Sequence, residues 1–212
     1  MKAYISHLEA RQITKLEAFL AEEGLININL SDEDKHILKN ETKWAEFKLS
    51  DIFDWQSQVE INPLHLEKIK ISNKEKYPFY GQATANNGII THCELKEEVL
   101  NNKMGKPTIL IHSNNQNVVF VETPFYLKDG HGATSVLQAI FLNKLNALFI
   151  MSSIKKVILE RFSYNAKATK IGLKNTIIQL PVTDGGTPNF TYMEAYVKAQ
   201  QKLIIASVIQ RF

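Results

Sequence analysis

The sequence has few of the features that mark secreted, disulfide-bonded or membrane-spanning proteins. Its 212 residues include a single cysteine, Cys93, which excludes an internal disulfide. No basic segment followed by an apolar stretch opens the chain, as it would in a secretory signal. The longest apolar run, Ala147–Met151 after Leu145, falls far short of the roughly 20 residues that cross a bilayer. These absences predict a cytoplasmic protein.

The motifs of common catalytic and metal sites are also missing. Metal sites usually need closely spaced ligands, whereas the six histidines are scattered, with no HExxH or CxxC pattern. The adjacent His92 and Cys93 are only a weak zinc signal, because neighbouring side chains often point apart. Gly105-Lys106-Pro107-Thr108 resembles the end of a phosphate-binding loop but lacks the glycine that should stand five residues earlier. We therefore expect no catalytic residue, no metal and no cofactor.

Two classes of DNA-modifying enzyme are weaker alternatives. A DNA methyltransferase needs a glycine-rich cofactor loop and a proline-containing tetrapeptide; Asn62-Pro63-Leu64-His65 matches only the first half of that tetrapeptide, and no such loop accompanies it. A nuclease could use Glu94-Leu95-Lys96 with an upstream carboxylate, but this tripeptide arises by chance in most proteins of this length. The missing motifs disfavour a fragment of either enzyme.

Positive charge is concentrated in parts of the chain, although the net charge is only +3. Residues 1–46 contain six basic and nine acidic residues, whereas residues 144–174 contain seven basic residues and one acidic residue. In a second cluster, residues 68–76, four lysines are opposed by Glu75 alone. Clustered basic side chains neutralise backbone phosphates and release condensed counterions. The two clusters therefore predict contacts with nucleic acid, with a solvated lysine-rich surface as the alternative.

The length and the 44% apolar content allow one main domain with a small appendage. Residues 1–43 form a predicted N-terminal helical segment, with one helix from Ile5 to Glu23 and a short one that Ser31 and Asp34 start as a capping box and that ends near Lys39. Residues 44–188 have short apolar runs between turn signals, which predicts a strand-rich domain. The expected fold class is α+β, a mixed strand-rich domain flanked by terminal helices.

Within residues 44–188, the segments Ser135–Ser152 and 154–158 have helical spacing, and Asn86-Asn87-Gly88 and His112–Asn117 are predicted turns or loops. The better strand candidates are Ile69–Ser72, Tyr77–Tyr80, Thr108–His112, Val118–Val121 and Thr176–Leu180. Residues 189–212 are expected to form a C-terminal helix that a capping box of Thr191 and Glu194 starts.

Several segments match, in order and spacing, the elements of one known family. They are Trp44–Phe53, Pro78–Tyr80 with Asn86–Ile89, Phe120–Tyr126, His131–Thr134, Arg161–Lys167, Ile178–Val182 and Thr187–Glu194. In these elements the chain resembles the target-recognition domains of restriction-modification specificity subunits, of type I systems and of related type II systems with bipartite targets. The resemblance implies a recognition domain that enters the DNA major groove, and helical spacers that seat methyltransferase and restriction subunits.

The chain departs from the family pattern at two points. Family members often carry a glycine and a second basic residue after the tyrosine of the Arg161–Lys167 element, where this chain has Asn165 and Ala166, so Lys167 is the basic residue carried over. Type I specificity subunits usually contain two recognition domains, and this chain has one, like a half-subunit. The resemblance and the apolar C-terminal helix together predict a homodimer that reads an interrupted palindrome.

Base readout requires amide and hydroxyl groups near base edges, with basic side chains on the phosphates. Both kinds of side chain occur in the predicted domain. The residues expected to bind DNA are Lys68, Lys70, Lys74, Lys76, Tyr80, Asn86, Asn87, Asn114, Asn115, His131, Lys155, Lys156, Arg161, Tyr164, Lys167 and Lys170. The alternative from another class is a protein-binding adaptor whose terminal helices pair and whose basic patch is incidental.

Overall fold

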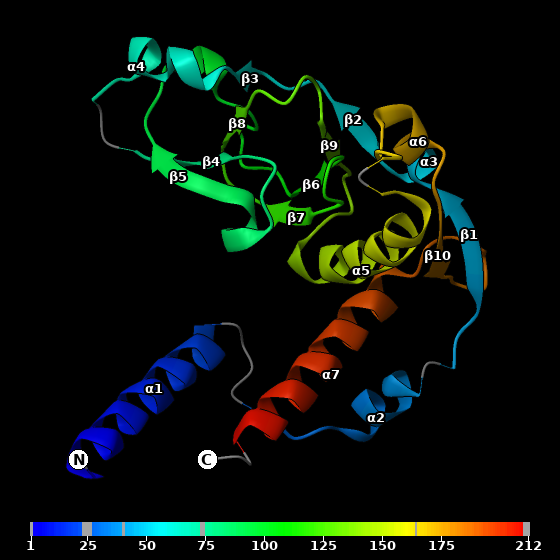
Figure 1. Cartoon of the computed structure of the whole chain (residues 1–212). Coiled ribbons are helices and arrows are strands. Elements are labelled where there is room, and N and C mark those ends of the chain that lie inside the picture. The colour runs from blue at the N-terminus through cyan, green and yellow to red at the C-terminus, as the bar shows by residue number, and fades with distance from the viewer. Residues whose placement is uncertain (1, 23–26, 40, 73–74, 164, 210–212) are drawn as a thin grey trace. The chain divides into compact units, whose positions relative to one another are not determined.

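A computed structural model describes residues 2–22, 27–39, 41–72, 75–163 and 165–209. The chain divides into two compact units, one made of Met1–Glu41 with Glu194–Phe212 and the other of Thr42–Met193 (Figure 1). The limits of the units lie close to the predicted boundaries of the strand-rich domain at residues 44 and 188. Among the described residues, none of the helices combines the length and the apolar character that a membrane span requires.

The first unit contains helices α1 (Lys2–Glu22) and α2 (Asp32–Leu38) and most of α7 (Phe190–Ile209). The predicted capping box of α2 is confirmed: Ser31 Oγ accepts from Asp34 N, and Asp34 Oδ2 accepts from Ser31 N. Lys202 of α7 also donates to Asp34 Oδ2 at 2.6 Å, and this hydrogen bond holds the pKa of the Asp34 carboxyl below its ordinary value. This pair joins α2 to α7.

The second unit contains two four-stranded sheets and a two-stranded pair. The central sheet has the order β2 (Asp54–Gln56), β9 (Thr134–Gln138), β6 (Thr108–His112) and β7 (Val118–Val121), all antiparallel. The outer sheet has the order β3 (Glu60–Ile61), β8 (Tyr126–Lys128), β4 (Tyr77–Tyr80) and β5 (Ile89–Cys93). In it β8 runs parallel to β3 and β4, while β4 and β5 are antiparallel. The pair joins β1 (Trp44–Lys48) to β10 (Ile177–Pro181).

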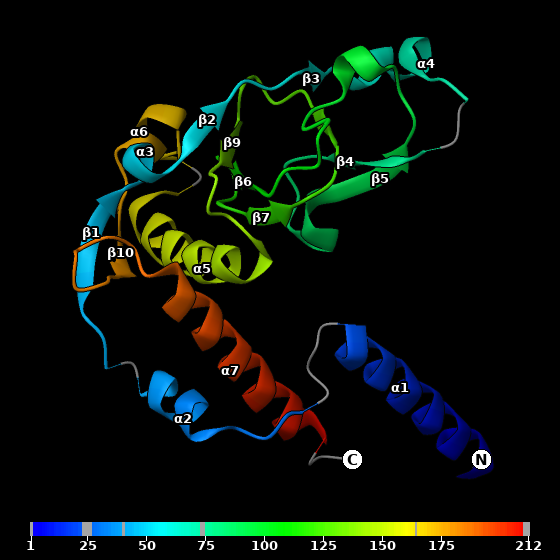
Figure 2. The ribbon, with the colours of Figure 1, turned by 180° about the vertical axis from the view of Figure 1, so that it is seen from behind.

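Helix α5 (Lys144–Arg161) packs against the central sheet, beside β7 and β10, in both views (Figures 1 and 2). Asn143 caps it through a hydrogen-bonded box with Asn146, and Ile150, Ile154 and Ile158 form its buried face. Strand β6 is covered on both faces, since its alternate side chains enter two different apolar clusters. The short helices are α3 (Leu49–Ile52), α4 (Leu66–Ile69), α6 (Lys170–Lys174), and the 3₁₀ turns Pro63–His65, Ala85–Gly88 and Glu97–Val99.

The predicted α+β class is confirmed, as are the strands Tyr77–Tyr80, Thr108–His112 and Val118–Val121. Two predictions were wrong in residues 69–72 and 135–143. Ile69 ends helix α4 and is followed by a single bridge, Lys70 to Leu95, and not by a strand. Residues 134–138 form the strand β9, buried between β2 and β6, so the helix begins only at Lys144. Burial on both faces of the sheet overrode the helical spacing there.

The predicted capping box at Thr191 was also wrong. Helix α7 begins one residue earlier, at Phe190, and Asn189 Oδ1 accepts a hydrogen bond from Tyr192 N at 3.0 Å. Asn189 therefore caps α7 through the backbone N–H of Tyr192, and Thr191 lies inside the first turn, where it cannot be the N-cap residue. The ring of Phe190 stacks on Phe141 with centroids 4.0 Å apart, which fixes the start of α7 against the loop before α5.

Candidate nucleic-acid interface

Four loops of the second unit meet at one end of its two sheets. They are residues 81–88 after β4, 113–117 between β6 and β7, 129–133 between β8 and β9, and 162–163 with 165–169 after α5, and we call them the four-loop surface. Asn117 Nδ2 donates to Ala83 O at 3.0 Å, which joins the first two loops. Ser113 N donates to Ala133 O and Ala168 N donates to Ser113 O, which joins the second loop to the others.

Side chains from the strands brace these loops from beneath. Glu60 Oε2 on β3 accepts from the backbone N–H of Gly130 and of Gly132, both at 3.0 Å. Gln58 Nε2 donates to Thr134 O at 2.8 Å, and Gln58 Oε1 accepts from Lys170 Nζ at 3.2 Å. The loop of residues 129–133 is therefore attached to β3, and α6 is attached to the segment that precedes β3.

The backbone in these loops adopts unusual conformations. Among the described residues, Asn86, Asn87, Gln116 and His131 have positive φ, between 48° and 55°, and only Asn102 does so elsewhere among residues other than glycine. Such conformations persist only where the surrounding hydrogen bonds determine them, and they concentrate at functional sites. Here they turn Asn86, Asn87 and His131 outward, and all three residues are exposed.

The four-loop surface brings together most of the predicted amide and loop residues. Asn86 and Asn87 lie in its first loop, Asn114 and Asn115 are half-buried in its second, and His131 lies in its third. Lys167 is exposed in its fourth loop, and Lys170 lies beside it on α6. Segments up to 81 residues apart in the sequence, 86 and 167, thus contribute to one surface. Tyr164 and Lys74 lie outside the described residues.

The C-terminal half of α5 supplies basic residues next to this surface. Lys155 and Lys156 are exposed on the helix, which leads directly into the fourth loop. Arg161 at the end of α5 is already engaged: its Nη1 donates to Asn175 O at 3.2 Å and Thr176 Oγ1 at 3.3 Å, and its guanidinium lies 5.2 Å from the centre of the Phe162 ring. Arg161 therefore holds the chain between α6 and β10 in place.

Lys68, Lys70 and Lys76 lie elsewhere, beyond the other end of β4 and β5. Ile71 N donates to Glu94 O and Lys96 N donates to Ile69 O, so this segment pairs with the residues after β5, whereas residues 81–88 lie between the two strands. Lys68 and Lys76 are exposed, and Lys70 forms an ion pair with Glu67.

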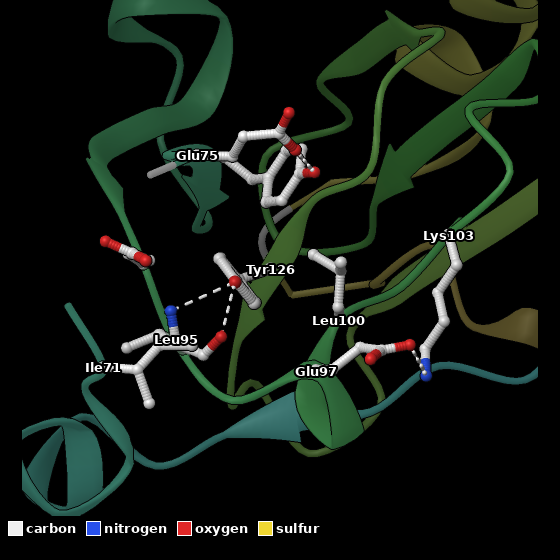
Figure 3. A pocket seen from close by; sticks show the side chains of 9 residues that line it. Ile71, Glu75, Leu95, Glu97, Leu100, Lys103 and Tyr126 are labelled. Carbon is white, nitrogen blue, oxygen red and sulfur yellow. Dashed lines mark hydrogen bonds and ion pairs between the residues drawn. The ribbon is translucent and has the colours of Figure 1, made fainter. Parts of the chain in front are cut away.

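A pocket of 570 Å³ adjoins this segment (Figure 3). Glu75, Glu94 and Glu97 line it. Tyr126 lines it as well, and its Oη accepts from Leu95 N and donates to Leu95 O. Lys103, on its rim, pairs with Glu97 at 3.3 Å. The three carboxylates oppose the neighbouring lysines and repel phosphate. This end of the outer sheet therefore carries both acidic and basic side chains, and we leave its lysines out of the proposed interface.

Tyr80 was expected at the DNA, but its ring lies inside the unit. It is 5% exposed and packs edge-on against Phe125, with centroids 5.9 Å apart. Burial also raises the pKa of its hydroxyl. Because β4 is covered on both faces, Tyr80 has a core position, and we leave it out of the proposed interface.

The sequence analysis did not identify the residues whose hydrogen bonds hold the four loops in place. Gln58, Glu60 and Gln82 were in no predicted element of the site, and Thr134 was named only as the end of the family element His131–Thr134. His112 was correctly predicted to end a strand, but its complete burial was not predicted. Each of these residues lies within two residues of a strand end, which is the one signal that the sequence offers.

Among the described residues, no group of three or more histidine, cysteine, aspartate or glutamate side chains could hold a metal ion.

Burial lowers the pKa of His112 to about 4, from 6.5. The unfolded chain therefore binds a proton at His112 as the pH falls below 6.5, while the folded chain does not until about pH 4. We expect the free energy of unfolding of this unit to fall by about 3 kcal/mol over that interval. Chemical denaturation across pH 4–7 measures it.

The variant His112→Leu is the control for this pH dependence, because it removes the titrating group. Asp34 and Asp129 have lowered pKa values and lose their stabilising effect only below their ordinary value of 3.8, so they titrate outside the interval. Superimposable pH profiles for the two proteins would show that His112 is not buried in its neutral form.

Comparison with known proteins shows which family this fold and sequence match. Residues 41–208 match the type I restriction modification DNA specificity domain. The type II restriction enzyme BgcI specificity subunit S.BcgI of Heyndrickxia coagulans is 24% identical over 172 residues, which cover 79% of this chain and 46% of that protein.

Two solved structures are similar to the fold. A type I restriction-modification S subunit from M. genitalium superposes with a TM-score of 0.55 at 17% identity, over 99% of this chain and 53% of that one. The HsdS subunit from Thermoanaerobacter tengcongensis gives 0.51 at 12% identity, over 99% and 51%. This chain spans about half the length of these relatives. By the match over most of its length, the chain belongs to the family of type I restriction-modification DNA specificity domains.

Proposed function

We propose that this chain binds duplex DNA and reads a short sequence with its four-loop surface. The observation that carries the proposal is the convergence of exposed Asn86, Asn87 and His131 with Lys167 on loops that are held by hydrogen bonds from beneath. Asparagine side chains can pair with adenine edges in the major groove, and lysines on the rim contact phosphates. Lys155 and Lys156 of α5 and Lys170 of α6 extend the basic rim.

The chain is proposed to act for other subunits and to carry out no catalysis itself. The relatives it matches are described as specificity subunits of restriction enzymes or as S subunits. In this role the chain selects the DNA site in the cytoplasm, and separate methyltransferase and restriction subunits modify or cut it. Purified chain incubated with methyl donor, magnesium and duplex DNA is expected to give no turnover.

We propose that a second copy of this chain binds to helix α7 of the first unit. Lys202 faces α2 through its ion pair with Asp34. Ile204 comes two residues after Lys202, which is a rotation of about 200° around the helix axis, so it lies on the side of α7 opposite Lys202. Its side chain is 61% exposed, and Val208 lies one turn further along the same side. An apolar stripe on a helix is stable in water when another surface covers it. Two copies related by a two-fold axis would cover it and present two four-loop surfaces to DNA.

Binding of the purified chain to a pool of random duplexes tests the proposed function. Repeated selection and sequencing should enrich one short motif, and the affinity should fall steeply as the salt concentration rises. The adaptor alternative, with an incidental basic patch, predicts no DNA binding. Binding without any enriched motif would reduce the function to non-sequence-specific attachment.

A further inference from the structure

Three polar side chains form a buried cluster beneath the four-loop surface. Gln82 Nε2 lies 2.8 Å from His112 Nδ1 and 2.8 Å from Thr134 Oγ1, and His112 Nδ1 lies 3.0 Å from Thr134 Oγ1. His112 is fully buried and Thr134 is 2% exposed. The three residues come from the first loop, the end of β6 and the start of β9.

The hydrogen bonds define the state of the histidine ring. An amide nitrogen can only donate, so His112 Nδ1 accepts, and the neutral ring carries its proton on Nε2. His112 Nε2 and Gln82 Oε1 are buried and have no hydrogen-bond partner among the described residues. Leaving such atoms unpaired costs free energy that an apolar cluster of the same size would not cost. Stability alone therefore does not explain why polar side chains occupy this position.

The cluster connects the loop that carries Asn86 and Asn87 with the loop that carries His131. On one side, Gly81 N donates to Gly88 O, and Gly88 has φ +84° beside the His112 ring. A Cβ atom on Gly88 would lie 3.4 Å from His112 Nε2, so the turn that carries Asn86 and Asn87 rests on this ring. On the other side, Thr134 directly follows the loop that presents His131.

We infer that His112 is a positioning residue for sequence readout, which with Gln82 and Thr134 fixes the loops of residues 81–88 and 129–133 in one relative arrangement. His112 itself does not touch DNA, because its ring is buried. The inference rests on the proposed function: amide side chains discriminate between bases only when both loops are held in place against the groove. Loops that shift independently would keep their phosphate contacts and lose their preference for one sequence.

The experiment compares His112→Leu with His112→Asn in the full chain. Leucine fills the space without an acceptor, whereas the asparagine carbonyl can accept near the position of Nδ1. We measure binding to a duplex with the motif that the unmodified chain selects, and to a duplex with that motif scrambled. His112→Leu should lower the preference for the motif at least tenfold, with unchanged affinity for the scrambled duplex, and His112→Asn should restore most of the preference.

The melting temperature separates positioning from a purely structural role. We expect His112→Leu to leave the melting temperature unchanged, because the substitution also removes the buried, unpaired Nε2. A loss of preference at an unchanged melting temperature would then exclude a purely structural role. If the melting temperature and the preference fall together, the pair Thr134→Val and Thr134→Ser decides, because valine keeps the shape and serine keeps the hydroxyl. Unchanged preference in both His112→Leu and Thr134→Val would overturn the inference.

Amide hydrogen exchange tests the positioning without DNA, and so separates it from the proposed function. The backbone N–H of Gly81 closes the first loop on Gly88 O, and that of Ser113 bonds to Ala133 O in the third loop. Both groups should exchange at least tenfold faster in His112→Leu than in the unmodified chain. If the unmodified chain selects no motif, the proposed function fails, and faster exchange still supports the positioning role of His112. Unchanged exchange at both groups would overturn that role, whatever DNA the chain binds.

Discussion

Replacing Lys155, Lys156 and Lys167 with alanine should lower the affinity of the chain for duplex DNA on the order of 100-fold at about 0.15 M salt. All three side chains are exposed, on the C-terminal half of α5 and on the loop that follows it. Each lysine that contacts a phosphate contributes about 0.9 to the slope of log affinity against log salt. The slope of the triple variant should therefore be less steep by about three units, on all sequences alike.

The matched control removes the same charge from the other end of the outer sheet. Lys68, Lys76 and Lys96 are exposed there, near the pocket that Glu75, Glu94 and Glu97 line. Replacing these three with alanine should change the affinity only a few-fold, because their contribution acts at a distance through screened solvent. Anisotropy titrations of a labelled duplex at several salt concentrations measure both variants. Equal losses in the two variants would mean that the net charge matters and not the four-loop surface.

Changing Ile204 to aspartate should convert a homodimer of the chain to a monomer. The substitution places a charge at the middle of the exposed apolar stripe of α7, where a second copy would have to bury it. Binding to a duplex with two half-sites should then weaken by a factor on the order of 100 to 10,000, because the two recognition surfaces no longer act as one molecule. Affinity for a single half-site should stay the same.

Light scattering of both proteins over a concentration series measures the change in mass. Thr191→Asp is the control, since it adds the same charge at an exposed position of the same helix, away from the stripe. A dimer that persists in Ile204→Asp would place the interface elsewhere. A wild-type monomer that binds one non-palindromic half-site with full affinity would remove pairing through α7 altogether.

Features that depend on neighbouring residues could be predicted from the sequence. The capping box of Ser31 and Asp34 involves atoms three residues apart, and β6 and β7 are short runs rich in β-branched residues on either side of a polar turn. Where two local signals competed, the prediction failed: both Asn189 and Thr191 can cap a helix, and α7 begins after the former. Val136 has helical spacing with Ile140, yet it lies in the central sheet.

The candidate interface could be predicted only in part, because its construction depends on contacts between distant segments. Asn86, Asn87 and His131 were recognised from turn chemistry and from the family resemblance, and they lie in adjoining loops. The hydrogen bonds of Gln82 to Thr134 and of Lys170 to Gln58 join residues 52 and 112 positions apart, and no local pattern announces them. For the same reason the lysines of residues 68–76 were predicted to contact DNA, whereas the structure places Glu94 and Glu97 of a later segment in one pocket with Glu75 of this segment.

Mapping of methylated bases in the genome of the organism that encodes this chain, with and without its gene, tests the central claim most directly. If the chain reads DNA sequence for a methyltransferase, deletion should abolish methylation at one motif and leave other methylated motifs unchanged. The motif should match the one that the purified chain enriches from random duplexes, and Lys155, Lys156 and Lys167 should be needed to restore it. A complete set of methylated motifs after deletion, with the methyltransferase subunit still expressed, would contradict the account.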